Sequence, residues 1–134
     1  MSVGLLIVTH GRIGDDLLHT ATEMLGLCPL QCETLPVSFD CDPAEELGKA
    51  VAAAKRLDEG DGVLVLTDMY GSTPSNIANR IREHHPVTVI AGINLPMLVR
   101  VLNYPRLELG VLEQKALSGG RDGILVCTPL EDDN

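Results

Sequence analysis

The fold of this chain follows from an apolar run near its N-terminus, Val3-Gly4-Leu5-Leu6-Ile7-Val8-Thr9-His10-Gly11-Arg12. A short run rich in valine, isoleucine and leucine that stops at a glycine is typical of a strand buried on both faces. The apolar positions of residues 13–25 then recur at helical spacing, which predicts a helix directly after the strand. We therefore expect His10 in a strand-to-helix turn.

The rest of the chain alternates strands and helices in the same way. Further strands are predicted at residues 30–37, 63–67, 87–92 and 124–127, and the first of these is expected near a sheet edge because its alternation is imperfect. Helix starts are predicted at Asp42-Pro43, at Thr73-Pro74 with Thr73 as N-cap, and near Asn94, and a last helix over residues 107–117 is expected to end at Gly119-Gly120. Short connections between alternating elements predict an α/β fold of three layers, α/β/α, with a mostly parallel flavodoxin-like sheet.

Length and charge limit the classes of function. The chain has 134 residues, the size of one domain, so we expect residues 1–134 to form a single domain. Its formal net charge is −9, and it has no cluster of lysine and arginine. Because affinity for the phosphate backbone depends on such clusters, nucleic acid is excluded as a partner, and the acidic surface favours a protein partner.

The cysteines and the hydropathy pattern bear on location. The four cysteines are interpreted as small residues of a reduced cytoplasmic protein: Cys28, Cys32, Cys41 and Cys127. The spacing of Cys28 and Cys32 is compatible with zinc, but Pro29 lies between them and no second pair is near, so no metal site is expected. No apolar run approaches the roughly 18 residues of a membrane span. We expect a soluble cytoplasmic protein, peripheral to a membrane at most.

The candidate catalytic residues lie at the ends of two predicted strands. In the flavodoxin-like strand order 2-1-3-4, His10 and Asp68 end adjacent strands at the same edge of the sheet. A carboxylate beside an imidazole fixes its tautomer and stabilises its cation. The following loop, Gly71-Ser72-Thr73-Pro74, leads into a helix N-terminus and suits a phosphoryl group or another anion, although capping by Thr73 explains the loop without any ligand. These observations make His10 a candidate general acid, general base, metal ligand or covalent nucleophile.

Four segments in order carry a resemblance to a known family. They are Leu6-Ile7-Val8-Thr9-His10-Gly11, Val63-Leu64-Val65-Leu66-Thr67-Asp68, Gly71-Ser72-Thr73-Pro74-Ser75-Asn76-Ile77-Ala78 and Val89-Ile90-Ala91-Gly92-Ile93-Asn94-Leu95-Pro96-Met97-Leu98. Together they resemble the enzyme IIA domain of the mannose family of the phosphoenolpyruvate-dependent sugar phosphotransferase system. The resemblance spans nearly the whole chain.

The resemblance implies a phosphorelay. A histidine-containing phosphocarrier protein would donate a phosphoryl group to His10, on the ring nitrogen farther from the backbone, and an enzyme IIB partner would accept it, with no metal or organic cofactor. Asp68 matches the carboxylate that orients the histidine in this family. Thr73 matches the hydroxyl residue before proline, and Ser72 stands where a second glycine is usual, so the geometry of phosphate contact is open there. Mannose-type relatives are dimers that exchange a terminal strand, which implies a homodimer that exchanges residues 124–127.

Three alternatives are weighed against this phosphotransferase. The first is a regulatory module whose phosphorylation state at His10 controls binding to another protein. The second is the phosphocarrier subunit of a dihydroxyacetone kinase system, which the segment of residues 91–98 disfavours. The third is a histidine phosphatase, suggested by residues 9–12 alone, which fails because no arginine-rich phosphate pocket is evident.

For the remaining candidate residues, a purely structural role is weighed against a functional one. His19 is interpreted as a surface residue, and His84-His85 as residues that suit a helix end. Arg12 could neutralise phosphate or contact a partner. An apolar rim against which a partner docks is one interpretation of Met69, Tyr70 and Met97, and core packing explains the methionines equally well.

Overall fold

Four parallel strands form the centre of the structure, a computed structural model that describes residues 2–130. They are β1 (Gly4–His10), β2 (Cys32–Val37), β3 (Val63–Thr67) and β4 (Thr88–Ala91). Their order in the sheet is β2-β1-β3-β4, which confirms the flavodoxin-like order and the edge position of β2. The carboxyl ends of β1 and β3 therefore lie side by side.

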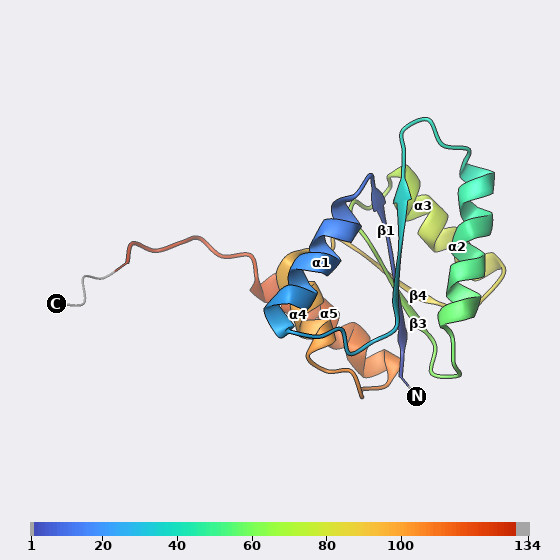
Figure 1. Ribbon diagram of the computed structural model, residues 1–134. Helices are drawn as coiled ribbons and strands as arrows, with labels where there is room; N and C mark the ends of the chain where they lie inside the picture. The colour runs from blue at the N-terminus through green and yellow to red at the C-terminus, as the bar shows by residue number, and fades with distance from the viewer. Residues whose placement is uncertain (1, 131–134) are drawn as a thin grey trace.

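Helices cover both faces of the sheet, as predicted (Figure 1). One face carries α1 (Ile13–Leu25), α4 (Leu95–Leu102) and α5 (Leu109–Asp122). The other face carries α2 (Pro43–Leu57) and α3 (Thr73–Arg80), and α3 continues into the short 3-10 helix η1 (Ile81–Glu83). Among residues 2–130, no helix has the length and apolar character that crossing a membrane requires.

Strand β1 divides the core between the two layers of helices. Leu5 and Ile7 pack with α1, α4 and α5, whereas Leu6 and Val8 pack with α2 and α3. All four side chains are fully buried, because successive residues of a strand point to opposite faces and both faces are covered. This two-sided burial explains the uninterrupted apolar run in the sequence.

The start of α3 differs from its prediction by one residue. Ser72, and not Thr73, is the N-cap of α3, and Thr73 occupies the first helical position. The Ser72 hydroxyl donates to the carbonyl of Met69 at 2.6 Å and does not cap the helix. The corresponding prediction for α2 is confirmed, since the Asp42 side chain accepts a hydrogen bond from the backbone of Ala44.

The prediction that α5 ends at Gly119-Gly120 is wrong, because the helix continues to Asp122. These glycines serve packing instead of termination. A Cβ on Gly119 would lie 2.8 Å from the Cβ of Arg100, and one on Gly120 would lie 2.8 Å from the Cε of Met97. Both neighbours belong to α4, so the glycines allow α4 and α5 to approach closely.

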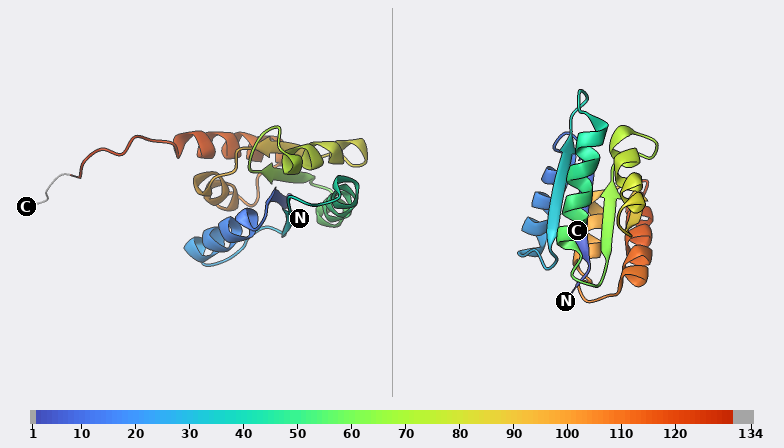
Figure 2. Two further views of the ribbon diagram at one scale, coloured as in Figure 1. Left: turned by 90° about the horizontal axis from the view of Figure 1, so that it is seen from above. Right: turned by 90° about the vertical axis from the view of Figure 1, so that its right-hand side faces the viewer.

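Residues 124–127 do not form the predicted strand with the sheet of their own chain. Helix α5 packs against α4, and the chain leaves its end in the direction away from the sheet (Figure 1, Figure 2). The side chains of Ile124, Leu125 and Val126 are 75%, 78% and 94% exposed. An apolar extended segment therefore lies in solvent.

Candidate functional site

The turn after β1 positions His10 at the edge of the sheet. The hydroxyl of Thr9 accepts a hydrogen bond from the backbone N–H of Gly14 at 2.9 Å, which ties the end of β1 to the first turn of α1. Gly11 has φ +47° and donates its N–H to the carbonyl of Val37 in β2. The strand end is thus fixed on both sides of His10.

Asp68 follows β3 and binds His10 through two contacts. Its Oδ2 accepts the backbone N–H of His10 at 3.0 Å and lies 2.8 Å from Nδ1 of the ring. Its Oδ1 accepts the backbone N–H of Met69 at 3.0 Å. The predicted juxtaposition of His10 and Asp68 is therefore confirmed, although 58 residues separate them in sequence.

The charge state of Asp68 fixes the tautomer of His10. Burial of Asp68 favours the neutral carboxyl, but the hydrogen bonds from the ring and the backbone of His10 outweigh it and lower the pKa of Asp68 below its ordinary value. An ionised carboxylate has no proton to donate, so Nδ1 carries the shared proton. The lone pair of neutral His10 then lies on Nε2, the atom farther from the backbone.

Exposed apolar side chains lie beside His10 and directly after Asp68. The ring of Phe39, in the loop between β2 and α2, lies 5.9 Å from the His10 ring and is 100% exposed. Met69 and Tyr70 are also exposed, as a rim requires, whereas Met97 is 4% exposed and belongs to the core. Sequence reasoning missed Phe39, whose only signal is that it is the sole phenylalanine of the chain.

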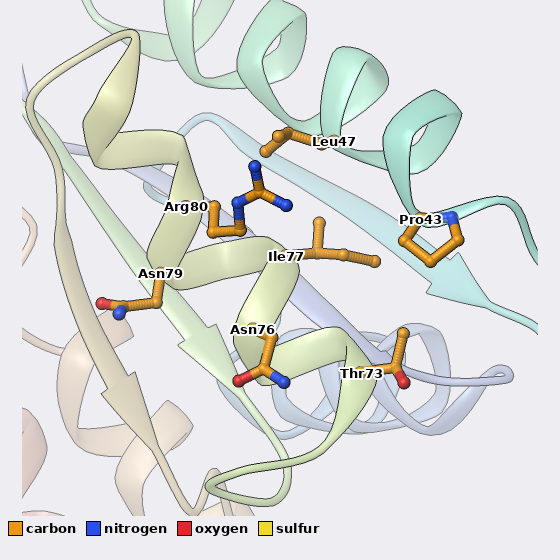
Figure 3. A pocket seen from close by; sticks show the side chains of 7 residues that line it. All are labelled: Pro43, Leu47, Thr73, Asn76, Ile77, Asn79 and Arg80. Atoms are coloured by element: carbon orange, nitrogen blue, oxygen red, sulfur yellow. The ribbon is translucent and has the colours of Figure 1, made fainter.

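The loop of Gly71, Ser72 and Thr73 follows Asp68 at the same edge of the sheet. Gly71 has φ +83°, a conformation that favours glycine, and Ser72 donates both its N–H and its hydroxyl to the carbonyl of Met69. Thr73 is exposed in the first turn of α3 (Figure 3). The structure thus places the loop between Asp68 and a helix N-terminus, where the helix dipole favours an anion.

A cleft of about 400 Å³ lies between α2 and α3, next to this loop (Figure 3). Pro43 and Leu47 of α2 form one wall, and side chains from Thr73 to Arg80 form the other. The Arg80 guanidinium also pairs with Glu83 at 3.4 Å. No motif in the sequence predicted this cleft, because it depends on the spacing of two helices.

The other candidate residues lie apart from His10 or have partners of their own. His19 is exposed and lies 3.2 Å from Glu23. His85 does not merely suit a helix end: its Nε2 is 2.8 Å from Oδ2 of Asp58. Oδ1 of the same carboxylate accepts the N–H groups of Gly60 and Gly62. Within residues 2–130, no group of three or more metal-ligating side chains could hold a metal ion.

Arg12 is the basic side chain nearest to His10 in sequence. It is 79% exposed, and its Nε lies 3.8 Å from Asp15. Its side chain is therefore directed to solvent and to α1, and the structure provides no contact between it and the His10–Asp68 pair.

The family of the chain is decided by a family model. The EIIA-man model, described as the PTS system fructose IIA component, matches residues 4–108. The chain belongs to this family. Members of the EIIA-man family are IIA components of the phosphotransferase system, so the chain is a phosphoryl carrier and a phosphotransferase that acts through a phosphohistidine.

Relatives and solved structures agree with this family. The chain is 36% identical over 145 residues to the PTS system mannose-specific EIIAB component of Escherichia coli K12, which covers 98% of this chain and 42% of that relative. The chain thus spans about two fifths of the length of that protein. It is also 30% identical over 118 residues to the transcriptional regulatory protein LevR of Bacillus subtilis, covering 84% of this chain and 12% of LevR.

The fold is shared with solved IIA proteins. The mannose/sorbose-specific IIA subunit of the phosphotransferase system from Enterococcus faecalis superposes with a TM-score of 0.86, at 23% identity and with 98% of each chain covered. A PTS IIA protein associated with the fucose utilization operon of Streptococcus pneumoniae gives a TM-score of 0.79 at 23% identity, covering 94% of this chain and 96% of the other. These similarities confirm the three-layer architecture of the EIIA-man domain.

Proposed function

We propose that His10 is the residue that carries the phosphoryl group and that Nε2 is the atom to which it is bound. The observation that carries the proposal is the 2.8 Å contact between Nδ1 of His10 and Oδ2 of Asp68. This contact leaves the lone pair of the ring on Nε2, on a side chain that is 29% exposed at the edge of the sheet. Family membership requires a histidine carrier, and His10 combines exposure with an orienting carboxylate.

The transfer needs positioning and charge stabilisation, with no metal or cofactor. The Nε2 lone pair attacks the phosphorus of a phosphohistidine on the donor protein, so that a new N–P bond forms as the donor's N–P bond breaks. The ring of His10 keeps its proton on Nδ1 and becomes positively charged as the bond forms. Asp68, ionised and in contact with Nδ1, stabilises that charge and so lowers the barrier. Transfer to the acceptor reverses these steps.

The loop of Gly71, Ser72 and Thr73 is proposed to receive the phosphoryl oxygens. It lies at the N-terminus of α3, and Thr73 presents a hydroxyl in the first helical turn. The Ser72 hydroxyl already donates to Met69, so Ser72 would contact phosphate only after that bond is given up. Thr73 is therefore the better candidate for a hydroxyl contact.

The proposed partners follow from the family. The donor is the histidine-containing phosphocarrier protein, and the acceptor is an enzyme IIB protein in the cytoplasm, with residues 1–134 acting as one IIA domain. The Escherichia coli relative unites IIA and IIB in its name, which supports an acceptor of the mannose-specific type. We also propose a homodimer in which residues 124–127 add to the sheet of a second copy.

A regulatory role is the second candidate, and the similarity to LevR favours it specifically. That relative is named a transcriptional regulatory protein. In a regulatory role, phosphorylation of His10 would change the binding of this chain to another protein instead of feeding transport. Label that moves from phosphorylated chain to purified IIB favours transport, and label that stays on His10 while partner affinity changes favours regulation.

The decisive experiment uses labelled phosphoenolpyruvate, enzyme I and the phosphocarrier protein. The wild-type chain is expected to acquire label, and His10→Ala is expected to acquire none. His19→Ala is the matched control, since His19 is an exposed histidine of α1 that should leave labelling unchanged. Label on His10→Ala would refute His10 as the acceptor, and label on neither protein would refute the phosphorelay.

A further inference from the structure

The loop between α1 and β2 lies at the end of the sheet opposite the carboxyl ends of the strands (Figure 1). It brings Cys28 close to Cys32. Cys32 is the first residue of β2 and pairs with Leu5, whereas Val37 pairs with His10. The five-residue separation along the strands corresponds to roughly 16 Å at about 3.3 Å per residue. This cysteine pair is therefore separate from the proposed phosphorylation site.

The two thiols face one another and share an acceptor. The Sγ atoms of Cys28 and Cys32 are 3.5 Å apart. Each thiol also donates to the carbonyl of Leu30, at 3.3 Å from Cys28 and 3.4 Å from Cys32. A disulfide has a sulfur–sulfur distance near 2.05 Å, so the two atoms need to approach by only about 1.5 Å.

The surrounding backbone allows this approach. Cys32 is held by the sheet, and the buried Leu30 anchors the middle of the loop. Cys28 lies outside both α1 and β2 and is exposed, so it can shift towards Cys32 without breaking a helix or a strand hydrogen bond. The loop therefore has one fixed cysteine and one adjustable cysteine.

A cavity gives small molecules access to both sulfurs. It has a volume of about 490 Å³ and is lined by Cys28 and Cys32, together with Asp15, His19 and other side chains of α1 and β2. The cavity is open to solvent, so a small disulfide can approach the two sulfurs from outside. The two titratable neighbours have partners, because Asp15 pairs with Arg12 and His19 with Glu23.

We propose that Cys28 and Cys32 form a redox-active dithiol, which reacts with low-molecular-weight disulfides of the glutathione class and closes to an intramolecular disulfide. The thiolate of Cys28 attacks one sulfur of the small disulfide, forming a mixed disulfide and releasing one thiolate, which takes up a proton. The thiolate of Cys32 then attacks the Cys28 sulfur and releases the second thiol. Two protein thiols are oxidised and one small disulfide is reduced to two thiols.

The environments of the two sulfurs predict the order and the speed of these steps. In the reduced pair, burial raises the pKa of Cys32, and its contact with Cys28 raises it further, whereas Cys28 is exposed. After Cys28 has reacted, the burial of Cys32 remains. The thiolate of Cys28 therefore attacks the small disulfide first, and the closing step depends on the scarce thiolate of Cys32. We expect the mixed disulfide on Cys28 to accumulate near pH 7 and the closing rate to rise with pH.

The test incubates the full chain, in a Cys41→Ser and Cys127→Ser background, with oxidised glutathione at pH 7, 8 and 9. Remaining thiols are alkylated, and peptides are identified by mass spectrometry. The expected result is a Cys28 adduct that converts to a Cys28–Cys32 disulfide, faster at higher pH. With Cys32→Ser the adduct on Cys28 should persist, and with Cys28→Ser the thiol at position 32 should stay largely unmodified.

Two outcomes would overturn the proposal. One is a Cys28 adduct that never closes, even at pH 9, in a chain whose circular dichroism shows it to be folded. The other is a closing rate that does not rise between pH 7 and pH 9, since closure is expected to depend on the thiolate of the buried Cys32. Labelling of His10 by the phosphocarrier is measured in parallel and is expected to be the same in the reduced and the closed forms.

Discussion

Oδ2 of Asp68 accepts two hydrogen bonds from His10, one from its backbone N–H at 3.0 Å and one from Nδ1 of its ring at 2.8 Å. One oxygen atom therefore fixes both the end of β1 and the orientation of the imidazole. Because Oδ1 is bound to the backbone of Met69, the carboxylate cannot rotate without losing that bond. The side chain of Asp68 is consequently both an electrostatic partner and a structural link between β1 and β3.

Replacing Asp68 by asparagine is expected to slow phosphorylation of His10 by about 10- to 100-fold. The substitution keeps the shape of the side chain but removes the negative charge, and a hydrogen bond to a charged group contributes about 1.5–3 kcal/mol. An amide can also present its N–H₂ to Nδ1, which would favour the tautomer whose Nε2 carries the proton. The measurement is the rate of labelling at fixed phosphocarrier concentration.

Asp58→Asn is the matched control for this experiment. Asp58 pairs with His85 at 2.8 Å and has a side-chain exposure of 19%, against 13% for Asp68. It lies between α2 and β3, at the end of the sheet opposite His10. Asp58→Asn should leave the labelling rate within about twofold, and equal losses in both variants would indicate a general structural effect.

The Asp68→Asn substitution should also change how the stability of the chain depends on pH. The pKa of Asp68 in the folded chain lies below its ordinary value, so its stabilising contribution is complete above the unfolded pKa of about 4 and is lost as pH falls through the folded pKa. The difference in free energy of unfolding between wild type and Asp68→Asn should be constant from pH 7 to about pH 5 and shrink below about pH 4. Urea unfolding at these pH values measures it, and a difference that persists unchanged at pH 2.5 would contradict the linkage.

Gly14→Ala is expected to destabilise the chain by about 1–3 kcal/mol, although alanine is normally the better helix former. A Cβ on Gly14 would lie 2.7 Å from Cγ2 of Ile7 and 3.1 Å from Oγ1 of Thr9. It would therefore push α1 away from β1 and weaken the hydrogen bond between Thr9 and the Gly14 N–H. Urea unfolding measures the loss.

Gly48→Ala provides the opposite expectation in the same measurement. Gly48 lies within α2, is exposed, and a Cβ built there meets no atom within 4 Å. Alanine at this position should stabilise the chain by about 0.5–1 kcal/mol. The two glycine-to-alanine changes should thus shift the free energy of unfolding in opposite directions. If both changes stabilise the chain, helix propensity outweighs the packing of α1 against β1.

Strand ends were predictable because they depend on local patterns and chain order. The buried runs locate β1 and β3, and the flavodoxin-like strand order places those strands side by side, which brings His10 to Asp68. By contrast, the bond between Thr9 and Gly14 and the contact of Phe39 with His10 depend on how a loop or helix packs in three dimensions. Neither leaves a periodic signal in the sequence.

The glycines of α5 show a different limit of sequence analysis. A Gly-Gly pair near the end of an amphipathic stretch is typical of a helix terminator, and the same pair is also typical of a close helix crossing. Only the contacts of Gly119 and Gly120 with α4 decide between these interpretations. Likewise, the run of residues 124–127 has strand composition, but composition does not say which sheet it joins.

Phe39→Ala is expected to weaken productive encounter with the phosphocarrier without affecting stability. The Phe39 ring is fully exposed beside His10, so its removal should change the free energy of unfolding by less than about 0.5 kcal/mol. An aromatic side chain at the centre of an interface commonly contributes enough to change transfer efficiency about tenfold. Leu27→Ala, which removes an apolar side chain that is 60% exposed in the loop after α1, is the control and should leave transfer unchanged.

The exposed C-terminal segment leads to a prediction about assembly. The segment leaves α5 beside the end of β4, since Ile124 lines a small cavity together with Ala91 and Gly92. β4 is an edge strand of the sheet, so it offers unpaired backbone groups to which an extended segment of a second copy can add.

A chain that ends at Gly123 should therefore sediment as a monomer, whereas the full chain should sediment as a dimer. A chain that ends at Leu130 keeps the apolar segment and should remain dimeric. If all three chains sediment as monomers, the exchange is refuted. Dimerisation of the chain ending at Gly123 would instead show that the interface lies elsewhere on the domain.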